Sequence, residues 1–431
     1  MIDYLKNIFV FEDLRRRFLY TLFMFAIYRL GSHIPIPGVD VVALEDFFKA
    51  MQGTLFNLYD IFSGGNLSRM TVFALGVMPY ISASIMMQLL TVAIPELQRL
   101  AKEEGDYGRY KINEYTKYLT LFVAFVQSIG IAFWLQNQTS PRGFPVVPEA
   151  GFLFIFVSVM TLVAGTMFLV WMGERITEKG IGNGMSLLIF AGIVAGFPNA
   201  VISLVDRLRS GDLAPFAVAG AVVMVLLVIV GIVYIQEAER RIPVQYPRRV
   251  VGRQEYRGGS TYLPIKINPA GVIPIIFAQS LLIIPSSVLT FIQHPIAQVI
   301  YDAFNPTSIF YNFLYVMLIV FFTYFYTAVM INPVEVADNL RKGGAFIPGV
   351  RPGLETQKFL ETVINRLVFV GALFLSVVAI IPLFISLQLN VPFYFGGTTA
   401  LIVVGVALDT LKQVEANLIT KKYKGYVRKR R

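Results

Sequence analysis

The chain has 431 residues, of which 56% are hydrophobic and 15% are charged, and its formal net charge at pH 7 is +10. With a mean hydropathy of +0.64, this composition exceeds what a soluble core can bury, so it disfavours a globular soluble enzyme. The chain lacks cysteine, and its two histidines, His33 and His294, lie far apart in sequence. Disulfides, thiolate nucleophiles and Cys/His zinc sites are therefore excluded, and we expect no metal and no cofactor.

The N-terminal region carries three arginines, Arg15 to Arg17, ahead of an apolar run without a small-residue cleavage site. We interpret this run as a retained first span and not as a signal peptide. A bilayer core of about 30 Å needs about 20 apolar residues per helix, and a window of that length finds ten candidates. They are residues 18–36, 72–94, 116–136, 151–172, 185–203, 214–235, 270–291, 309–331, 362–385 and 394–414.

Lysine and arginine are distributed unequally between the two sides of these spans. With the N-terminus inside, the cytoplasmic segments hold 29 Lys and Arg, whereas the outer loops hold 5. Cytoplasmic loops of membrane proteins carry the excess of Lys and Arg. The chain is therefore predicted to be a multi-pass membrane protein with both termini in the cytoplasm.

A short apolar segment, residues 54–62, precedes the second span and is too short to cross a bilayer. It ends in Ser63-Gly64-Gly65-Asn66-Leu67-Ser68-Arg69, which is typical of a flexible break. A half-helix hinged by glycines can fold back into a protein-lined cavity, where non-helical backbone is tolerated. The alternative is an interfacial helix that lies on the outer surface.

Two pairs of segments repeat along the chain, as in transport folds built from two halves. Gly76–Ala83 in the second span matches Gly271–Ala278 in the seventh at five of eight positions. Because each half has five spans, an odd number, the second half is predicted to be inverted, with a pore between the halves. The second match pairs Gly184, Leu188, Ile189 and Gly192 of the fifth span with Gly397, Leu401, Ile402 and Gly405 of the tenth.

The chain is thus predicted to be an all-α integral membrane protein with ten transmembrane helices in two inverted halves. The N-terminal half covers residues 1–205, the C-terminal half covers 206–415, and a basic tail covers 416–431.

The predicted spans hold almost no charge, since Arg29 and Asp409 lie near helix ends. Ion-coupled transporters need buried carboxylates or histidines, which disfavours a small-solute transporter. The absence of nucleotide-binding, zinc-protease and serine-hydrolase motifs disfavours a membrane enzyme. The repeat instead aligns isoleucines from four spans, which could form a dry constriction that blocks ions, although ordinary packed or lipid-facing isoleucine is the alternative. They are Ile81, Ile189, Ile276 and Ile402, with Ile85 and Ile193 one turn further on.

Two cytoplasmic segments carry more positive charge than topology requires. The loop 236–268 is also longer than topology requires, so we favour a docking role for it. The tail 416–431 suits ribosomal RNA, an acidic protein patch or anionic lipid equally well. The basic residues of the loop are Arg240, Arg241, Arg248, Arg249, Arg253, Arg257 and Lys266.

Five long motifs occur in order between the first span and the tenth. They are Phe62 to Arg69, Ala74 to Ile85, Gly180 to Gly184, Arg240 to Pro243 and Gly343 to Gly353. Together they resemble the SecY family, the channel-forming subunits of the bacterial SecYEG protein translocon. This resemblance implies a central hourglass pore closed by a short plug half-helix. It also implies a channel that passes unfolded secretory proteins and releases transmembrane segments laterally into the bilayer.

The resemblance implies four groups of site residues. The pore ring would comprise Ile81, Ile85, Ile189, Ile193, Ile276 and Ile402. The plug, near residues 55–69, would include Leu55, Phe56, Leu58, Tyr59, Ile61, Phe62, Ser63, Gly64 and Gly65. A lateral gate between spans 2 and 3 and spans 7 and 8 would use Gln88, Gln279 and Ser280. Docking on the loops 236–268 and 333–361 would use Arg240, Arg241, Arg248, Arg249, Arg253, Arg257 and Arg351.

Partners and location also follow from the resemblance. It implies the small membrane subunits SecE and SecG, the SecA motor ATPase, and the ribosome with its rRNA during insertion. Signal sequences and nascent polypeptides would be the substrates, anionic lipids would surround the channel, and the bacterial cytoplasmic (inner) membrane would hold it.

Overall fold

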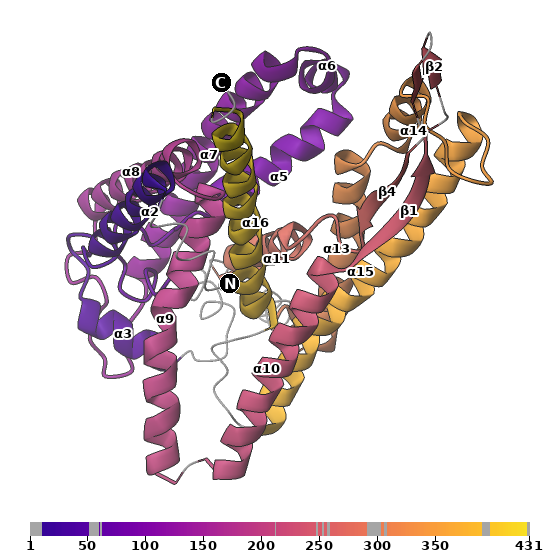
Figure 1. Cartoon of the computed structure of the whole chain (residues 1–431). Helices are drawn as coiled ribbons and strands as arrows, with labels where there is room; N and C mark the ends of the chain where they lie inside the picture. Colours follow the sequence, from indigo (N-terminus) through magenta and orange to yellow (C-terminus); the bar gives the residue numbers. More distant parts are fainter. Residues whose placement is uncertain are drawn as a thin grey trace. The chain divides into compact units, whose positions relative to one another are not determined.

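Figure 1 shows the protein as a computed structural model, in which helices predominate. The chain forms two compact units. Unit 1 comprises Met1–Asp212, Gln279–Asn312 and Val406–Arg431, and unit 2 comprises Leu213–Ala278 and Phe313–Gly405. The structure describes residues 11–50, 60, 63–211, 213–246, 249–251, 254–256, 259–290, 303–305, 308–389 and 397–428.

Unit 1 contains the N-terminal helices. They are α2 (Glu12–Gly31), α3 (Val41–Ala50), α5 (Met78–Ala93), α6 (Pro95–Glu103), α7 (Gly105–Gln136), α8 (Phe152–Lys179) and α9 (Gly184–Arg209). Within this unit, α7 packs against α5 and α8, α8 packs against α9, and α2 packs against α8 and α9. A Cβ atom on Gly165 of α8 would overlap the carbonyl oxygen of Val72. Such close packing through small residues is typical of membrane helices.

Unit 2 contains a long helix, a β-ribbon and parts of the C-terminal helices. The elements are α10 (Pro215–Glu237), β1 (Glu239–Gln245), β2 (Arg249–Val251), β3 (Gln254–Tyr256), β4 (Ser260–Lys266), α11 (Ile273–Thr290), α13 (Ile309–Met330), α14 (Pro333–Lys342), α15 (Leu354–Leu389) and α16 (Gly397–Arg428). Helices α11, α13 and α16 each begin in one unit and end in the other. Helix α15 packs against α10 and α14, while β1 pairs antiparallel with β4 and β2 with β3.

The second predicted span, residues 72–94, differs from the structure at its beginning. Helix α5 starts only at Met78, because the preceding backbone pairs with the segment after α2: Ile36 N donates to Met70 O at 2.9 Å and Val72 N to Ile34 O at 3.0 Å. The span ends as predicted at Ile94, whose extended backbone is the conformation that a following proline favours. Beyond this break, α6 is bent away from α5 by 105°.

Within the described residues, seven helices are long and apolar enough to cross a membrane, and the bent pair α5–α6 makes a possible eighth. Helix α2 has a suitable length, but acidic residues and three arginines occupy its first half. Helix α11 is apolar over the part whose side chains the structure describes, Ile273–Leu282, which by itself is shorter than a span. The all-α membrane class is confirmed, with the addition of a ribbon in the loop 236–268, and the count of ten spans stays a prediction.

The first pair of repeated segments adopts one local structure in both units. Gly76 has φ +57° and Gly271 has φ +63°, a left-handed conformation that glycine adopts without steric cost. In both segments the helix begins two residues later, at Met78 or Ile273, and its second residue is proline. Proline is well tolerated in the first turn of a helix, where its missing N–H has no intrahelical partner.

The second pair of repeated segments also agrees in structure. Gly184 and Gly397 are the first residues of α9 and α16. A Cβ atom on either residue would overlap a carbonyl oxygen of the preceding helix, that of Gly173 on α8 or Val378 on α15. The repeated segments therefore share more than residue identity: α9 and α16 also begin at the same position of the repeat and pack closely against the helix before them.

Candidate functional site

The C-terminal end of the predicted plug and the residues after it, 63–71, form a largely buried segment that we call the plug neck. Asn66 Nδ2 donates to Ser63 O and to Tyr28 Oη, the latter at 3.2 Å, while Tyr28 Oη donates to Ser63 O at 3.2 Å. Thr71 Oγ1 donates to Asn66 Oδ1 at 3.1 Å. Ser63, Asn66 and Tyr28 are 1%, 0% and 4% exposed. Six residues of the predicted plug, Leu55, Phe56, Leu58, Tyr59, Ile61 and Phe62, lie outside the described residues.

The plug neck contacts α9 through glycine. Gly64 has φ +79°, and a Cβ atom there would lie 2.7 Å from Gly192 Cα and 3.0 Å from Tyr28 Oη. Gly65 also has a positive φ, +77°, but a Cβ atom there would meet nothing within 4 Å. The chain therefore needs glycine at residue 64 for two reasons, backbone conformation and close approach.

The predicted pore isoleucines divide between the two units. Ile189 and Ile193 flank Gly192 on α9, so the plug neck approaches α9 beside two predicted ring residues. Both are buried, as are Ile81 and Ile85, which lie one turn apart on α5. In unit 2, Ile276 on α11 is half-buried and Ile402 on α16 is fully buried. The ring that would join all six isoleucines stays a prediction.

Asp60 lies three residues before Ser63, the first residue of the plug neck, and is half-buried. Desolvation raises the pKa of its carboxyl group above the ordinary value, although hydrogen bonds from Ser68 and Ser63 favour the charged form. Asp60 Oδ1 accepts from Ser68 N at 2.8 Å, and Asp60 O accepts from Gly65 N at 2.8 Å. Asp60 therefore stabilises the turn at Gly64 and Gly65 in two ways: its carboxyl group binds Ser68 N, and its backbone oxygen binds Gly65 N.

The predicted lateral-gate residues share an unusual feature. Among the described residues, Gln88 Oε1, Gln279 Oε1 and Ser280 Oγ are buried atoms without a hydrogen-bond partner. Gln88 Nε2 donates to Ser84 Oγ at 3.3 Å, so only one end of that amide is satisfied. A buried polar atom without a partner costs free energy. These atoms are therefore available to accept or donate hydrogen bonds.

The two predicted docking loops fold into a single structure in unit 2. Gln245 of β1 and Phe346 exchange two backbone hydrogen bonds, of 2.9 and 3.0 Å. Beneath them, Ile242 and Val244 of β1 share a core with Leu360 and Ile364 of α15. This core fixes the ribbon to α15.

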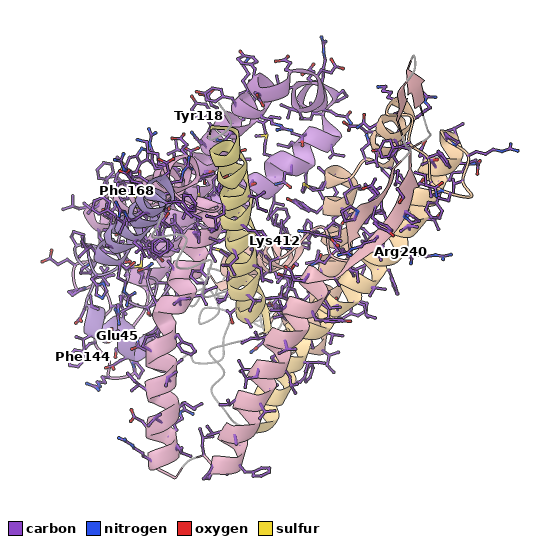
Figure 2. The ribbon with its side chains drawn as sticks, viewed as in Figure 1. Glu45, Tyr118, Phe144, Phe168, Arg240 and Lys412 are labelled. Carbon is purple, nitrogen blue, oxygen red and sulfur yellow. The ribbon has the colours of Figure 1, made fainter. Side chains whose placement is uncertain are left out.

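The structure describes some of the predicted docking arginines and not others. Arg240 and Arg241 on β1 and Arg351 before α15 are exposed, and Figure 2 labels Arg240 beside the ribbon. Arg241 Nε lies 2.8 Å from Glu239 Oε1. Arg249 lies in β2, and Arg248, Arg253 and Arg257 lie outside the described residues. Among the predicted docking arginines, the structure therefore shows Arg240, Arg241 and Arg351 to be exposed.

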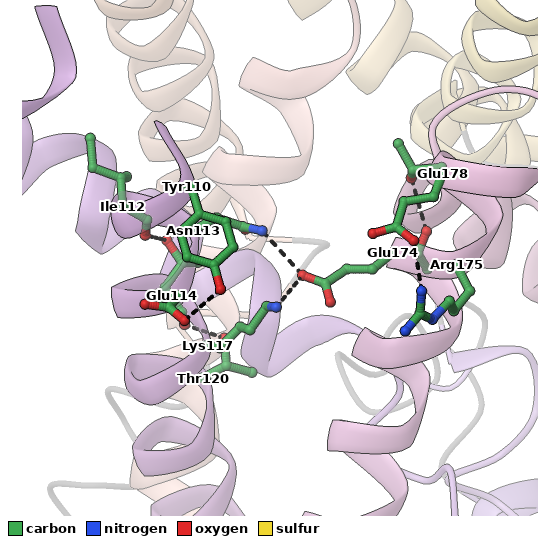
Figure 3. Close-up of polar contacts among 12 residues, drawn as sticks. Tyr110, Ile112, Asn113, Glu114, Lys117, Thr120, Glu174, Arg175 and Glu178 are labelled. Atoms are coloured by element: carbon green, nitrogen blue, oxygen red, sulfur yellow. Dashed lines mark hydrogen bonds and ion pairs between the residues drawn. The ribbon is translucent and has the colours of Figure 1, made fainter. Parts of the chain in front are cut away.

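A polar link between α7 and α8 was not predicted from the sequence. Glu174 Oε1 of α8 accepts from Lys117 Nζ at 2.7 Å and from Asn113 Nδ2 at 3.1 Å, both on α7 (Figure 3). The side chains of Lys117 and Glu174 are 33% and 27% exposed. Tyr28 was likewise missed as a site residue, and Asn66 lay within the predicted plug range 55–69 but was not singled out. The sequence shows each as a polar group in an apolar or glycine-rich run.

Comparison with known proteins gives a consistent result. A family model described as SecY matches residues 71–411. The protein translocase subunit SecY of Aquifex aeolicus is 70% identical over 429 residues, which covers 100% of both chains. Two solved structures share the fold at lower identity. One, described as a study of the SecY plug domain, has a TM-score of 0.67 and 18% identity and covers 94% of this chain and 93% of that one. The other, Sec61 in the canine ribosome-channel complex, has a TM-score of 0.63 and 17% identity, with the same coverage.

The sequence match covers the whole chain, so it includes the plug neck, both predicted docking loops and the repeated helix starts, and the fold match covers 94% of the chain. The chain therefore belongs to the SecY family, whose members are channel subunits of the protein translocase and not enzymes.

Proposed function

We propose that the chain is a gated, passive conduit that passes unfolded secretory proteins across a membrane and releases transmembrane segments sideways into lipid. The observation that carries this proposal is the seat of the plug neck on α9, where Gly64 meets Gly192 between Ile189 and Ile193. In a chain of the SecY family, this contact supports a plug whose C-terminal end lies beside the predicted ring. A motor or a ribosome would supply the work, and the chain would supply the path and the seal.

The isoleucines suit a seal that also lets a polypeptide pass. Large aliphatic side chains around a narrow waist exclude water and thereby block ions. They present no polar atom that would hold a passing side chain, so chains of varied sequence could slide through. The closed state would combine this constriction with the plug.

The unsatisfied polar atoms of Gln88, Gln279 and Ser280 suit a gate whose surfaces separate during use. A signal sequence is apolar and helical, so it gains free energy when it partitions from the channel into lipid. Its binding would bias the equilibrium between closed and open states, and plug displacement would follow. The three polar side chains could hydrogen-bond a segment that crosses the gate.

The basic surface at Arg240, Arg241 and Arg351 suits an anionic partner. Sec61 was solved in a ribosome-channel complex, which supports a ribosome as one partner here. The same surface could dock the SecA motor, and SecE and SecG would complete the membrane complex. We place this complex in the bacterial inner membrane with both termini in the cytoplasm. The unequal distribution of Lys and Arg between the two sides of the predicted spans supports this orientation.

Cross-linking from a single cysteine tests the conduit, because the natural chain has none. Ile193→Cys changes a side chain of α9 that is 4% exposed. Ile202→Cys is the matched control, because it makes the same change on the same helix at a side chain that is 57% exposed. In vesicles that contain the whole complex and a stalled secretory precursor, Ile193→Cys should cross-link to the precursor. Ile202→Cys should react with a lipid-soluble reagent instead. Labelling of Ile193→Cys from lipid alone would refute the pore assignment.

A further inference from the structure

We infer that Tyr28 and Asn66 form a latch that holds the plug neck against α9 in the closed channel, so that both act as positioning residues for gating. The inference rests on the proposed function, because it assigns a role to the end of that channel's plug. It is carried by a side-chain network that joins α2 to the neck and adjoins the contact between Gly64 and Gly192.

Tyr28 connects two elements that are distant in sequence. Its hydroxyl group donates to Ser63 O and accepts from Asn66 Nδ2, both at 3.2 Å, so each role of the hydroxyl is used by the neck. The ring stacks on Phe73 with a centroid distance of 5.9 Å and an interplanar angle of 13°. The ring is therefore held by packing, and only the hydroxyl group depends on the neck.

Asn66 is fully buried, and the neck together with Tyr28 of α2 supplies hydrogen bonds to both ends of its amide group. The amide nitrogen donates to Ser63 O and Tyr28 Oη, and the amide oxygen accepts from Thr71 Oγ1. A buried amide that loses its partners costs more free energy than its hydrogen bonds contribute on balance. Bonds in one network also strengthen each other, so we expect the latch to hold or release as a unit.

The glycine contact alone does not fix the position of the neck. Gly64 and Gly192 bring two backbones together, which supplies fit but no directional bond between side chains. The directional bonds come from Tyr28, Asn66 and Thr71. Loss of the latch should therefore shift the neck toward the open state without unfolding the helices around it.

Tyr28→Phe is the sharpest test, because it removes the hydroxyl group and keeps the stacked ring. Tyr20→Phe is the matched control, since it makes the same change on the same helix. The whole complex is reconstituted in vesicles without precursor, and the iodide leak is measured together with the thermal midpoint. Tyr28→Phe removes two hydrogen bonds, so it should raise the leak over the control by at least roughly 2- to 10-fold, the ratio expected for a single net hydrogen bond. The midpoint and the precursor transport rate should stay at control values.

Asn66→Ala and the double variant complete a mutant cycle. Asn66→Ala should raise the leak more than Tyr28→Phe does, and the double variant should match Asn66→Ala, because both changes break one network. Independent, multiplying effects would overturn the latch, and so would a leak of Tyr28→Phe equal to that of Tyr20→Phe. Should Tyr28→Phe not assemble, Thr71→Val removes the donor to Asn66 Oδ1 and must raise the leak instead. If Ile193→Cys cross-links to precursor while these variants do not leak, the latch fails and the conduit stands; if no cross-link forms, the conduit itself fails.

Discussion

Gly64→Ala should open the closed channel, and its cost can be derived from two separate effects. A non-glycine residue in the left-handed region costs about 1–2 kcal/mol. The added methyl group would lie 2.7 Å from Gly192 Cα, a backbone atom that cannot rotate away, and such overpacking costs about 1–3 kcal/mol. The two costs together lower the stability of the closed neck by about 2–5 kcal/mol.

Gly65→Ala provides the internal control, because Gly65 has a similar positive φ but open space at its Cβ position. It should cost only the backbone term of about 1–2 kcal/mol. We expect the iodide leak of reconstituted vesicles to be about tenfold or more higher for Gly64→Ala than for Gly65→Ala, since about 1.4 kcal/mol corresponds to a factor of ten. Equal leaks from the two variants would refute the steric contact between the plug neck and α9.

Three further predictions concern the rest of the molecule. Leu360→Ala should destabilise the ribbon core by about 2–5 kcal/mol and expose the loop 236–268 to protease, whereas Leu354→Ala, at a side chain that is 74% exposed on the same helix, should not; equal cleavage would contradict the shared core. Desolvation raises the pKa of Asp60 above its ordinary value of 3.8. The closed neck should therefore be most stable below pH 3.8, where the carboxyl group is protonated, and should lose stability as the pH rises through the raised pKa. The leak should thus fall on acidification, and Asp60→Asn should remove this pH dependence; a dependence that persists in this variant would argue against Asp60. Glu174→Gln should lower stability by less than about 1 kcal/mol, since both partners are partly exposed, and should remove part of the salt dependence of the thermal midpoint; a larger loss would mean that the α7–α8 link is stronger than its exposure indicates.

Hydropathy predicted the helices well because apolar length alone decides whether a segment can span a bilayer. It could not place the start of α5, because residues 72–77 are as apolar as the helix that follows them. What separates the two segments is the bridge between Pro35 and Thr71 and the positive φ of Gly76, both of which depend on tertiary structure or on backbone conformation. A window average contains neither kind of information.

The ribbon and the latch were missed for different reasons. In β1, Ile242 and Val244 alternate with exposed residues, the period of a half-buried strand, but charge and Pro243 obscured the pattern. A two-stranded ribbon tolerates this proline, because each strand has a free edge. Tyr28 lies in an apolar helix, where the sequence shows a ring but not the partner of its hydroxyl group. Hydrogen-bond partners 35 and 38 residues away become visible only in the folded chain.

The matched glycines Gly192 and Gly405 explain how one repeat can serve two purposes. In unit 2, a Cβ atom on Gly405 would lie 2.9 Å from Val272 Cγ2, so a side chain fills the space over that glycine. In unit 1, a Cβ atom on Gly192 would lie 3.1 Å from Tyr28 Oη and 3.4 Å from the backbone of Gly64, so the contact with the plug neck is made by backbone atoms. A packed valine makes many dispersion contacts, whereas a glycine backbone makes few and can separate at a lower cost. The repeat therefore offers equivalent surfaces in both halves. Under the proposed function the plug neck leaves α9 during transport, and a contact made by the backbone of Gly64 suits that separation better than a packed valine would.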